Sequence, residues 1–400
     1  MKKSIMFMLI NMNVGGTEKA LLNMISEMPK EKFDITILML EEYGGFLGSI
    51  PSDVKVEYLT GYKNIKEILK RPLHVTAIDL LIKGQFIKAL IMTFLYFISK
   101  IKKERSLFYK YILREFPVVK NEYDIAVAYA GPMDFISYFI AHKIKAKKKI
   151  QWIHFDITKI GFNKYFAAKV YNKFDQIFVV SKEAKNKLIS SLPILKYRTE
   201  EFLNIISPKV IHNQAKESGG FQDNFEGLRI LTVGRLSIEK GQDLAIKVLA
   251  RLIKEGYKVK WYCVGEGDAR EQYEDLIERH SLKDNFILLG TNPNPYPYIK
   301  QCDIYVQPSR YEGYCVTLME ARCLNKPILT TEVNGTKEQI KNEETGLIVC
   351  IDENEIYKAL KKLIVNKELR NKFEKNLSIE TIEPGVEMQK LIKLLKTIEN

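Results

Sequence analysis

Two cationic side chains stand where a predicted strand turns into a helix, in the stretch VGRLSIEKGQD at residues 233–243. Residues 229–233 form a short apolar run typical of a buried strand, and apolar residues recur at helical spacing after Ser237. Arg235 and Lys240 therefore lie at a strand-to-helix turn, where free backbone N–H groups favour negative charge. We expect these two side chains to bind an anion.

Glycines mark two further turns after predicted strands. In NVGGTE, Gly15 and Gly16 allow the backbone to approach a ligand at the start of a helix, although a tight turn that needs glycine explains the pair equally well. In WYCVGEGD, Gly265, Glu266 and Gly267 repeat the layout of strand, turn and helix. This second turn lacks the third glycine of the dinucleotide fingerprint and does not follow the first strand of the chain, so a bound NAD is a poor interpretation.

A pair of glutamates flanks another helix start, in the stretch SRYEGYCVTLMEA at residues 309–321. Glu312 lies in a glycine-containing turn after a predicted strand, and Glu320 lies about one turn into the following helix. The two carboxylates can accept hydrogen bonds from sugar hydroxyls, whereas two surface glutamates without a function are the alternative. Backbone N–H groups at the helix start can hold phosphate oxygens, and they belong to Gly313, Tyr314, Cys315 and Val316.

Strand-like and helix-like segments, which must position these side chains, alternate twice along the 400 residues. In the first half the predicted strands are 4–10, 33–40, 124–128, 149–154 and 176–180. In the second half they are 229–233, 258–264, 286–289, 304–307, 327–330 and 347–350. The pattern predicts an α/β protein with two Rossmann-like parallel-sheet domains facing a cleft, because parallel sheets bind ligands at the carboxyl ends of their strands.

The composition, with 46% hydrophobic and 28% charged residues, fits two domains of ordinary size. The polar stretch 214–227 contains a pair of glycines and is predicted to be a linker. We therefore predict an N-terminal domain over 1–213, with a helical insertion at about 62–116, and a C-terminal domain over 228–375. Residues 376–400 are predicted to be a C-terminal helical segment, for which packing back on the N-terminal domain is one arrangement.

The cysteines and the apolar segments indicate in which cellular compartment the protein is expected. The five cysteines all lie in the second half and form no C-x-x-C pair, so a reducing cytoplasm fits better than a zinc site or a disulfide framework. The first residues, MKKSIMFMLI, imitate a signal peptide, but no small-residue cleavage site follows, and we interpret them as a strand. The longest apolar run, residues 89–98, is about half of the ~20 residues that span a bilayer.

The net charge of +13 is unevenly distributed. Residues 1–212 hold 34 Lys and Arg against 20 Asp and Glu, whereas residues 213–400 hold 28 against 29. The densest segments are SKIKKER at 99–105, directly after the apolar run, and HKIKAKKKI at 142–150. Basic segments beside apolar side chains are attracted to anionic membranes, and a merely solvated lysine-rich face is the alternative. Nucleic acid is not expected as a partner, because no nucleic-acid-binding motif accompanies the charge.

The motifs taken together resemble those of one family. The chain resembles the retaining glycosyltransferases of family 4, the group 1 glycosyltransferases, which have the GT-B fold. The similar motifs are GRLSIEKG, VGEG and a Glu-Gly pair that is followed, after seven intervening residues, by a second glutamate. NVGGTE near the start, and VSKEAKNKL and KVIHN later in the first half, extend the resemblance over nearly the whole chain. The resemblance is strongest over residues 229–349.

The resemblance implies a role for each matched residue. Arg235 and Lys240 match the pair that neutralises the donor diphosphate and stabilises it as a leaving group. Glu312 matches the glutamate beside the donor sugar, and Glu320 matches the glutamate that binds the nucleotide ribose. Gly16 matches a loop glycine close to the phosphates and the acceptor. The other donor-binding residues expected from the matched motifs are Gly15, Gly265, Glu266, Gly313, Tyr314, Cys315 and Val316.

His154, in WIHFD, matches a histidine of the N-terminal domain that faces the donor sugar. A single histidine at a strand end is more often structural, and only the resemblance favours a catalytic role. Two positions depart from the family pattern. Phe155 stands where the family often has an aspartate, with Asp156 one residue later, and Cys315 stands where it often has a second glycine.

The resemblance implies a retaining, hexosyltransferase-type enzyme. It would move a sugar from a nucleotide diphosphate sugar, expected to be a UDP-sugar, to a glycan or lipid-linked acceptor in cell-surface polysaccharide or glycoconjugate assembly. No Asp-x-Asp pair occurs in the chain, so we expect no metal and no cofactor, with two cations replacing a divalent metal. We expect a cytoplasmic protein, peripheral on the inner face of the membrane. A non-catalytic GT-B partner subunit and a GT-B nucleotide-sugar epimerase stay open as alternatives.

Overall fold

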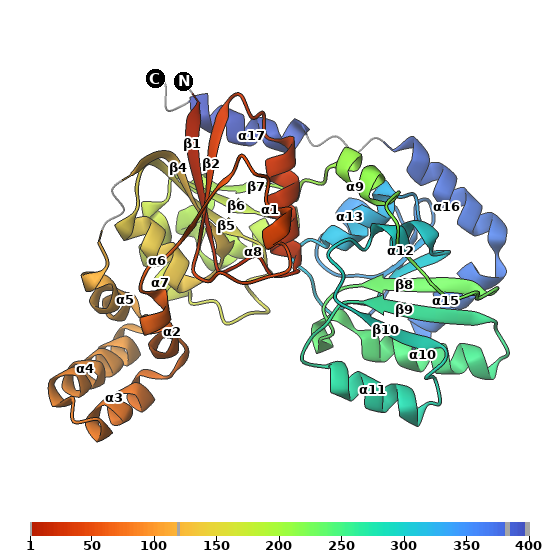
Figure 1. Cartoon of the computed structure of the whole chain (residues 1–400), viewed down its shortest axis with the longest axis horizontal. Helices are drawn as coiled ribbons and strands as arrows, with labels where there is room; N and C mark the ends of the chain where they lie inside the picture. Colours follow the sequence, from red (N-terminus) through yellow and green to blue (C-terminus); the bar gives the residue numbers. More distant parts are fainter. Residues whose placement is uncertain (1, 118–120, 381–384, 397–400) are drawn as a thin grey trace. The chain divides into compact units, whose positions relative to one another are not determined.

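A computed structural model describes residues 2–117, 121–380 and 385–396. Contacts between elements group the chain into two compact units. Among the described residues, the first unit holds 2–12, 28–117, 121–202 and 390–396, and the second holds 13–27, 203–380 and 385–389. Each unit contains one parallel sheet, as predicted, and we describe each by itself (Figure 1).

The first unit is built on a seven-stranded sheet whose strands pair in parallel. In spatial order the strands are β3 (Lys55–Tyr58), β2 (Phe33–Met39), β1 (Lys3–Leu9), β4 (Glu122–Gly131), β5 (Lys145–Ile153), β6 (Gln176–Val179) and β7 (Thr199–Glu201). The central strands β1 and β4 are almost continuously apolar and buried, as expected of strands covered on both faces. The edge strands β3 and β7 are only four and three residues long, which is too short to give a strand signal in the sequence.

Three helices that follow strands of this sheet are α6 (Asp134–Lys143), α7 (Lys164–Val170) and α8 (Lys182–Ser191). Ser181 caps α8, because its hydroxyl accepts a 3.1 Å hydrogen bond from the backbone N–H of Ala184. Phe139 of α6 and Phe166 of α7 are fully buried in the core with Ile177 of β6. Burial of each such side chain stabilises the fold by roughly 1.5–3 kcal/mol.

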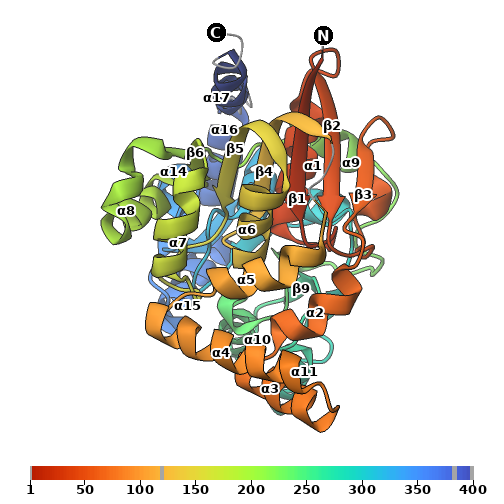
Figure 2. The same cartoon turned by 90° about the vertical axis from the view of Figure 1, so that its left-hand side faces the viewer.

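Residues 62–116 form the expected group of helices between β3 and β4. They are α2 (Tyr62–Lys70), α3 (Leu73–Ile82), α4 (Phe86–Lys102) and α5 (Ser106–Ile112). Helices α3 and α4 form a hairpin that extends away from the seven-stranded sheet (Figure 1), and they lie side by side in both views (Figure 2). Leu73 and Ala77 of α3 and Met92 and Leu95 of α4 belong to the core of the unit.

The second unit is built on a six-stranded parallel sheet. In spatial order its strands are β10 (Phe286–Gly290), β9 (Val259–Val264), β8 (Leu228–Val233), β11 (Ile304–Gln307), β12 (Ile328–Thr331) and β13 (Leu347–Val349). All six lie within one residue of the strands predicted for this half. Trp261, Tyr273 and Phe286 are among the largest side chains of its core.

The remaining helices group with the second unit, except that the last residues of α17 group with the first. They are α1 (Gly16–Glu27), α9 (Pro208–Gln214), α10 (Gln242–Lys254), α11 (Arg270–Arg279), α12 (Tyr296–Gln301), α13 (Val316–Cys323), α14 (Thr336–Gln339), α15 (Glu353–Val365), α16 (Lys367–Ile379) and α17 (Gly385–Lys396). Short 3-10 turns are η1 (Leu47–Ser49), η2 (Leu113–Glu115), η3 (Tyr171–Lys173), η4 (Pro193–Arg198) and η5 (Ile238–Lys240).

The structure places some boundaries differently from the sequence analysis. The first unit gives way to the second between residues 202 and 203, before the predicted linker at 214–227, because α9 groups with the second unit. The predicted boundary at 375 falls inside α16. Of the predicted segment 376–400, residues 381–384 and 397–400 lie outside the described residues. Residues 390–396 group with the first unit, where Lys390 Nζ donates a 2.8 Å hydrogen bond to the backbone oxygen of Glu201.

Candidate active site

Three neighbouring strands of the second sheet bring the predicted residues to one edge. Strand β8 lies between β9 and β11, and all three run parallel, so their carboxyl ends meet at the same edge. The loop after β8 carries Arg235 and Lys240, the loop after β9 carries the VGEG turn, and the loop after β11 carries Glu312. Side chains 72 residues apart in sequence thereby become neighbours.

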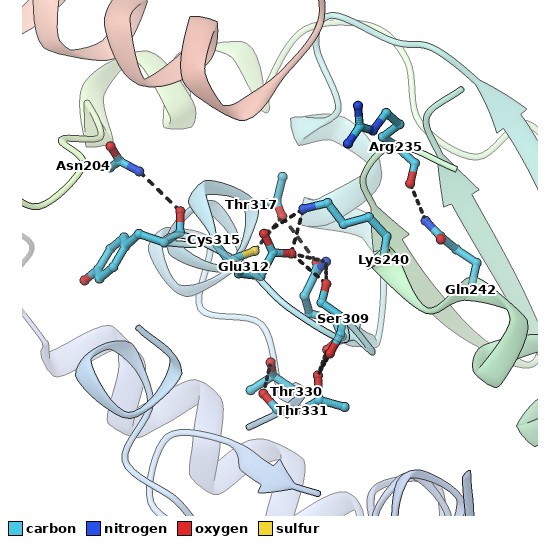
Figure 3. Close-up of polar contacts among 12 residues, drawn as sticks. Asn204, Arg235, Lys240, Gln242, Ser309, Glu312, Cys315, Thr317, Thr330 and Thr331 are labelled. Atoms are coloured by element: carbon cyan, nitrogen blue, oxygen red, sulfur yellow. Dashed lines mark hydrogen bonds and ion pairs between the residues drawn. The ribbon is translucent and has the colours of Figure 1, made fainter. Parts of the chain in front are cut away.

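Lys240 and Glu312 form an ion pair at this edge. Lys240 Nζ lies 2.7 Å from each carboxylate oxygen of Glu312, and the two side chains point toward one another (Figure 3). The hydroxyl of Ser309 donates a further 2.7 Å hydrogen bond to Glu312 Oε1. The side chain of Glu312 is 8% exposed and that of Lys240 is 23% exposed. The carboxylate is therefore shielded, whereas part of Lys240 is open to a ligand.

The ion pair keeps Lys240 charged. Burial alone would lower the pKa of Lys240, but the Glu312 carboxylate more than offsets this effect and holds the pKa above its ordinary value. Lys240 is thus protonated throughout the physiological pH range. A fixed positive charge in a partly buried turn suits the binding of a phosphate group.

Arg235 is held by its backbone rather than by its side chain. Its backbone oxygen accepts a 2.9 Å hydrogen bond from Gln242 Nε2, which ties the turn to the first residue of α10 (Figure 3). The Arg235 side chain is exposed. The turn after β8 therefore carries one cation that is already paired and a second that is accessible to an anion.

Glycine is needed where the loops after β8 and β9 touch. Gly265 has a φ of +149°, and a Cβ atom there would lie 2.0 Å from the backbone oxygen of Gly234. A Cβ atom on Gly267 would lie 2.2 Å from the backbone oxygen of Leu236. The backbone N–H of Leu236 also donates a 3.0 Å hydrogen bond to the backbone oxygen of Glu266. The packing of these loops thus explains both glycines before any ligand is considered.

The acidic side chain between these glycines is engaged by a nearby arginine. Glu266 Oε1 lies 2.5 Å from Nη1 of Arg270 on α11, and the Glu266 side chain is 44% exposed. The structure therefore ties the VGEG turn to the neighbouring loop through the Glu266 backbone, while its carboxylate lies in a surface ion pair. Such exposed pairs contribute at most about 1 kcal/mol to stability.

Helix α13 begins directly after the turn that carries Glu312 and Gly313. Cys315, its N-cap residue, provides no capping hydrogen bond, so the N–H groups of the first turn, from Val316 onward, suit an external anion. Burial raises the pKa of the Cys315 thiol to about 12, so this side chain is neutral. The backbone oxygen of Tyr314 accepts a 3.3 Å hydrogen bond from Asn204 Nδ2, which fixes the preceding turn (Figure 3).

Glu320 lies deeper than Glu312. It is 2% exposed on α13, and its Oε1 accepts a 2.8 Å hydrogen bond from the hydroxyl of Tyr296. Burial raises the pKa of Glu320, and the opposing charge of Lys19 and the hydrogen bond from Tyr296 lower it in part. Lys19 Nζ also lies 4.7 Å from the centre of the Tyr296 ring. Neither Lys19 nor Tyr296 could be predicted from the sequence, because neither belongs to the segment that carries Glu320.

The NVGGTE stretch leads into helix α1, which starts at Gly16. A Cβ atom on Gly16 would lie 4.0 Å from Cγ2 of Val316, whereas one on Gly15 would lie 2.6 Å from a carboxylate oxygen of Glu18. Burial raises the pKa of Glu18 to about 7, against the opposing effects of a backbone hydrogen bond and the charge of Arg235. Glu18, which the sequence analysis did not single out, therefore changes its charge near neutral pH.

His154 belongs to the first unit, where it directly follows β5. It is 6% exposed, and its ring centre lies 4.5 Å from that of Tyr129. Burial lowers the pKa of His154 to about 3, although a hydrogen bond to the backbone of Tyr129 opposes this shift. Its Nε2 atom has no hydrogen-bond partner among the described residues. Asp156 serves the fold instead, because it accepts a 2.8 Å hydrogen bond from Lys187.

The turn after β11 carries two more polar residues that the sequence analysis did not assign. Ser309 binds Glu312, as described above, and Arg310 forms two hydrogen bonds of 2.7 and 2.6 Å to the Asp243 carboxylate. Asp243 lies on α10, directly after the turn with Lys240, so this second ion pair fastens the two loops to each other. Ser309 and Arg310 both lie in the SRYEGYCVTLMEA stretch, but the sequence does not reveal that their partners are Glu312 and Asp243.

Two further properties concern only the residues that the structure describes. Within them, no group of three or more His, Cys, Asp or Glu side chains is arranged to hold a metal ion. Their helices include none that is both long and apolar enough to cross a membrane.

Residues 216–378 match the sequence profile of the family described as "Glycosyl transferases group 1". The chain is 30% identical over 214 residues to the N-acetylgalactosamine-N,N'-diacetylbacillosaminyl-diphospho-undecaprenol 4-alpha-N-acetylgalactosaminyltransferase of Campylobacter jejuni. That match covers 53% of this chain and 57% of the relative, so the chain spans only about half the length of the curated relatives that it matches first.

Solved structures match nearly the whole chain. TarM of S. aureus, in a complex with UDP, superposes with a TM-score of 0.71 at 16% identity, over 98% of this chain and 99% of that one. HepE of Anabaena, also in complex with UDP, superposes with a TM-score of 0.67 at 16% identity, over 99% of this chain and 100% of that one. The chain has the GT-B fold, and its residues 216–378 form a domain of the group 1 glycosyltransferase family.

Proposed function

We propose that the protein is a retaining glycosyltransferase that moves a hexosyl group from a nucleotide diphosphate sugar to a glycan or lipid-linked acceptor. The observation that carries the proposal is the Lys240–Glu312 ion pair, which lies beside Arg235 and the start of α13 at one sheet edge. This arrangement combines cations and N–H groups suited to a diphosphate with a carboxylate suited to sugar hydroxyls.

In the proposed reaction the bond between the anomeric carbon and the donor diphosphate oxygen breaks. The acceptor oxygen forms its bond to the same face of that carbon, and the acceptor proton passes to the departing diphosphate. Arg235 and Lys240 stabilise the negative charge that builds on the diphosphate, so they act on the transition state more strongly than on the bound donor. Glu312, held by Lys240 and Ser309, would orient the donor sugar through its hydroxyls.

The donor proposed is a UDP-sugar, and Glu320 would bind its ribose. Both TarM and HepE were crystallised with UDP, which supports this choice of nucleotide. For His154 we propose a hydrogen bond from its neutral ring to the donor sugar, which rests on the family resemblance and on the unsatisfied Nε2 atom.

A lipid diphosphate is the acceptor class that we favour, in cell-surface polysaccharide or glycoconjugate assembly. The name of the Campylobacter jejuni relative includes a diphospho-undecaprenol acceptor. The excess of positive charge in residues 1–212 would attract such an acceptor and the anionic membrane that holds it. The enzyme would then work in the cytoplasm, bound peripherally to the inner face of the cell membrane.

We also propose that transfer needs no divalent metal, because Arg235 and Lys240 supply the positive charge at the diphosphate. Transfer rates should therefore change by no more than about twofold when EDTA is added. Loss of a single group that stabilises the transition-state charge typically lowers the rate by about 10²–10³-fold, so the two outcomes are easily distinguished. A strict requirement for magnesium or manganese would contradict the proposed role of the two cations.

The direct test is to incubate the protein with UDP-sugars and with lipid-linked or soluble glycan acceptors. The proposal predicts release of UDP together with a glycosylated acceptor whose anomeric configuration, measured by NMR, equals that of the donor. An epimerised nucleotide sugar without acceptor product would instead identify an epimerase. A protein that binds no nucleotide and only activates another transferase would be the non-catalytic subunit, and either result would overturn the proposal.

A further inference from the structure

Large apolar side chains are concentrated on the α3–α4 hairpin of the first unit. Of the 22 large hydrophobic side chains that are exposed among the described residues, ten lie between residues 75 and 101. Six of these lie on α4, and each is at least 58% exposed. They are Phe86, Ile87, Leu90, Phe94, Phe97 and Ile101, and we call these six the apolar ridge. Contiguous apolar surface of this kind marks a site of interaction.

The six side chains of the apolar ridge share one face of the helix. Successive residues of an α-helix turn by about 100°, so these positions fall within a single arc of about 100°. Ala89, Met92 and Leu95 lie on the opposite arc, and all three are buried. Met92 and Leu95 join the core of the unit, so the helix cannot rotate to hide its ridge without exposing that packed face.

Lysines border the apolar ridge. Lys100 and Lys102 of α4, which fall on the two sides of the ridge arc, and Lys83 at the hairpin tip are all exposed. Lys100 Nζ lies 4.9 Å from the centre of the half-buried Tyr96 ring, which draws that side chain along the helix surface. Residues 62–116 as a whole contain twelve Lys and Arg against four Asp and Glu. The surroundings of the ridge are therefore strongly basic.

We propose that the apolar ridge is a membrane-docking surface that lies in the interface of an anionic lipid bilayer. The apolar side chains would enter the boundary between headgroups and acyl chains, while the bordering lysines contact anionic headgroups. Helix α4, with 17 residues, is ~26 Å long and can lie flat in that interface. This inference deepens the proposed function. It rests on the proposed function only for the claim that the same membrane carries the acceptor.

Charge favours a lipid surface over a second copy of the chain. In a two-fold symmetric dimer the same basic patch would face itself, and like charges would meet across the interface. An anionic bilayer offers the opposite charge along the whole ridge. The flanking lysines also extend on flexible stems, so their charges can reach the headgroups while the ridge is buried.

The structure changes which residues carry this surface. In the sequence the apolar run 89–98 directly precedes a group of cations, but Leu95 of that run points into the core. Arg105 also belongs to the interior, because its Nε and Nη2 atoms are buried and its guanidinium lies 4.5 Å from the Phe108 ring centre. A charge reversal that includes Arg105 would therefore disturb folding as well as lipid binding.

The test compares two double variants of the full chain in vesicle flotation. Leu90→Ser with Phe94→Ser removes two side chains from the ridge. Ile194→Ser with Tyr197→Ser removes two exposed side chains from η4 of the same unit, where Ile194 is 64% and Tyr197 is 94% exposed. Vesicles of phosphatidylcholine are used with and without phosphatidylglycerol, and circular dichroism and thermal unfolding check that both variants are folded.

The proposal predicts that the wild type and the η4 variant bind vesicles containing phosphatidylglycerol equally, and neutral vesicles more weakly. The ridge variant should lose roughly tenfold to a hundredfold in its partition coefficient. A folded ridge variant that binds like the wild type would overturn the proposal, as would an equal loss in the η4 variant. A wild type that ignores vesicles but forms a dimer disrupted by the ridge variant would identify a second copy instead.

A separate assay distinguishes this inference from the proposed function. Hydrolysis of the UDP-sugar by the wild type and the ridge variant is measured without vesicles, and equal rates are expected because the ridge lies outside the candidate site. Absence of hydrolysis and transfer in the wild type would count against the proposed function, whereas the flotation result would still decide the role of the ridge.

Discussion

The carboxyl edges of the two sheets hold their ionisable side chains in opposite ways. In the second unit Lys240 and Glu312 share an ion pair, which holds the pKa of Lys240 above its ordinary value. In the first unit His154 is packed against Tyr129, and burial lowers its pKa to about 3. A buried group keeps its charge only where a partner is supplied, so one edge is suited to a charged ligand and the other presents a neutral ring.

The largest effect should come from removing the cation at the charged edge. We expect Lys240→Ala to lower the rate of sugar transfer by about a hundredfold to a thousandfold, because one stabilising group of the leaving diphosphate is lost. Lys358→Ala is the matched control, because Lys358 also loses an ion pair, 2.8 Å to Glu355, but on an exposed face of α15. Steady-state kinetics measures the transfer rate of both variants after each is shown to be folded. Equal rates in the two variants would remove Lys240 from the site.

A second prediction tests whether the charged edge depends on its glycine loops. Gly265→Ala should lower the free energy of unfolding by about 2–3 kcal/mol more than Gly256→Ala, measured by denaturant titration. Gly256 also has a positive φ, +83°, but an added Cβ meets nothing within 4 Å, whereas one on Gly265 lies 2.0 Å from the Gly234 backbone oxygen. Equal losses would show that the two loops do not need this close contact.

A smaller effect should appear at the neutral edge as a pH dependence of stability. Because the pKa of His154 is about 3 when folded and about 6.5 when unfolded, the unfolded chain binds the extra proton between these values. Stability is therefore present above pH 6.5 and is lost as the pH falls. Between pH 7 and pH 5, the wild type should lose up to about 2 kcal/mol more than His154→Phe.

Chemical unfolding at a series of pH values measures this difference. His74→Phe, which removes an exposed histidine from the same unit, is the control for the loss of a histidine. Parallel pH curves for the wild type and His154→Phe would mean that His154 is not held neutral by burial, and the contrast between the two sheet edges would be lost.

Much of the second sheet could be predicted from the sequence, because its strands are short apolar runs with turns on either side. The same logic placed Arg235, Lys240 and Glu312 at strand ends, and parallel strands bring such ends together. The partners of these side chains were not predictable. The bond from Tyr296 to Glu320 joins α12 to α13, and it depends on how two helices pack on the sheet.

The first unit shows a different limit. In the apolar run of α4, adjacent residues differ in burial, since Phe94 is 62% exposed and Leu95 is 6% exposed. The sequence reveals that the run is apolar, but the side that faces the core is chosen by packing against α3. Strands β3 and β7 were missed for a different reason, because with four and three residues, most of them polar in β7, they are too short to show the alternation that identifies a strand.

The central claim is that the loops after β8, β9 and β11 bind the donor diphosphate. Isothermal titration with UDP in the presence of EDTA tests it most directly, on the wild type, on the Arg235→Ala, Lys240→Ala double variant and on Lys358→Ala. The account predicts that the wild type and Lys358→Ala bind UDP alike, and that the double variant loses at least about a hundredfold in affinity. A folded double variant that binds UDP as tightly as the wild type would contradict it.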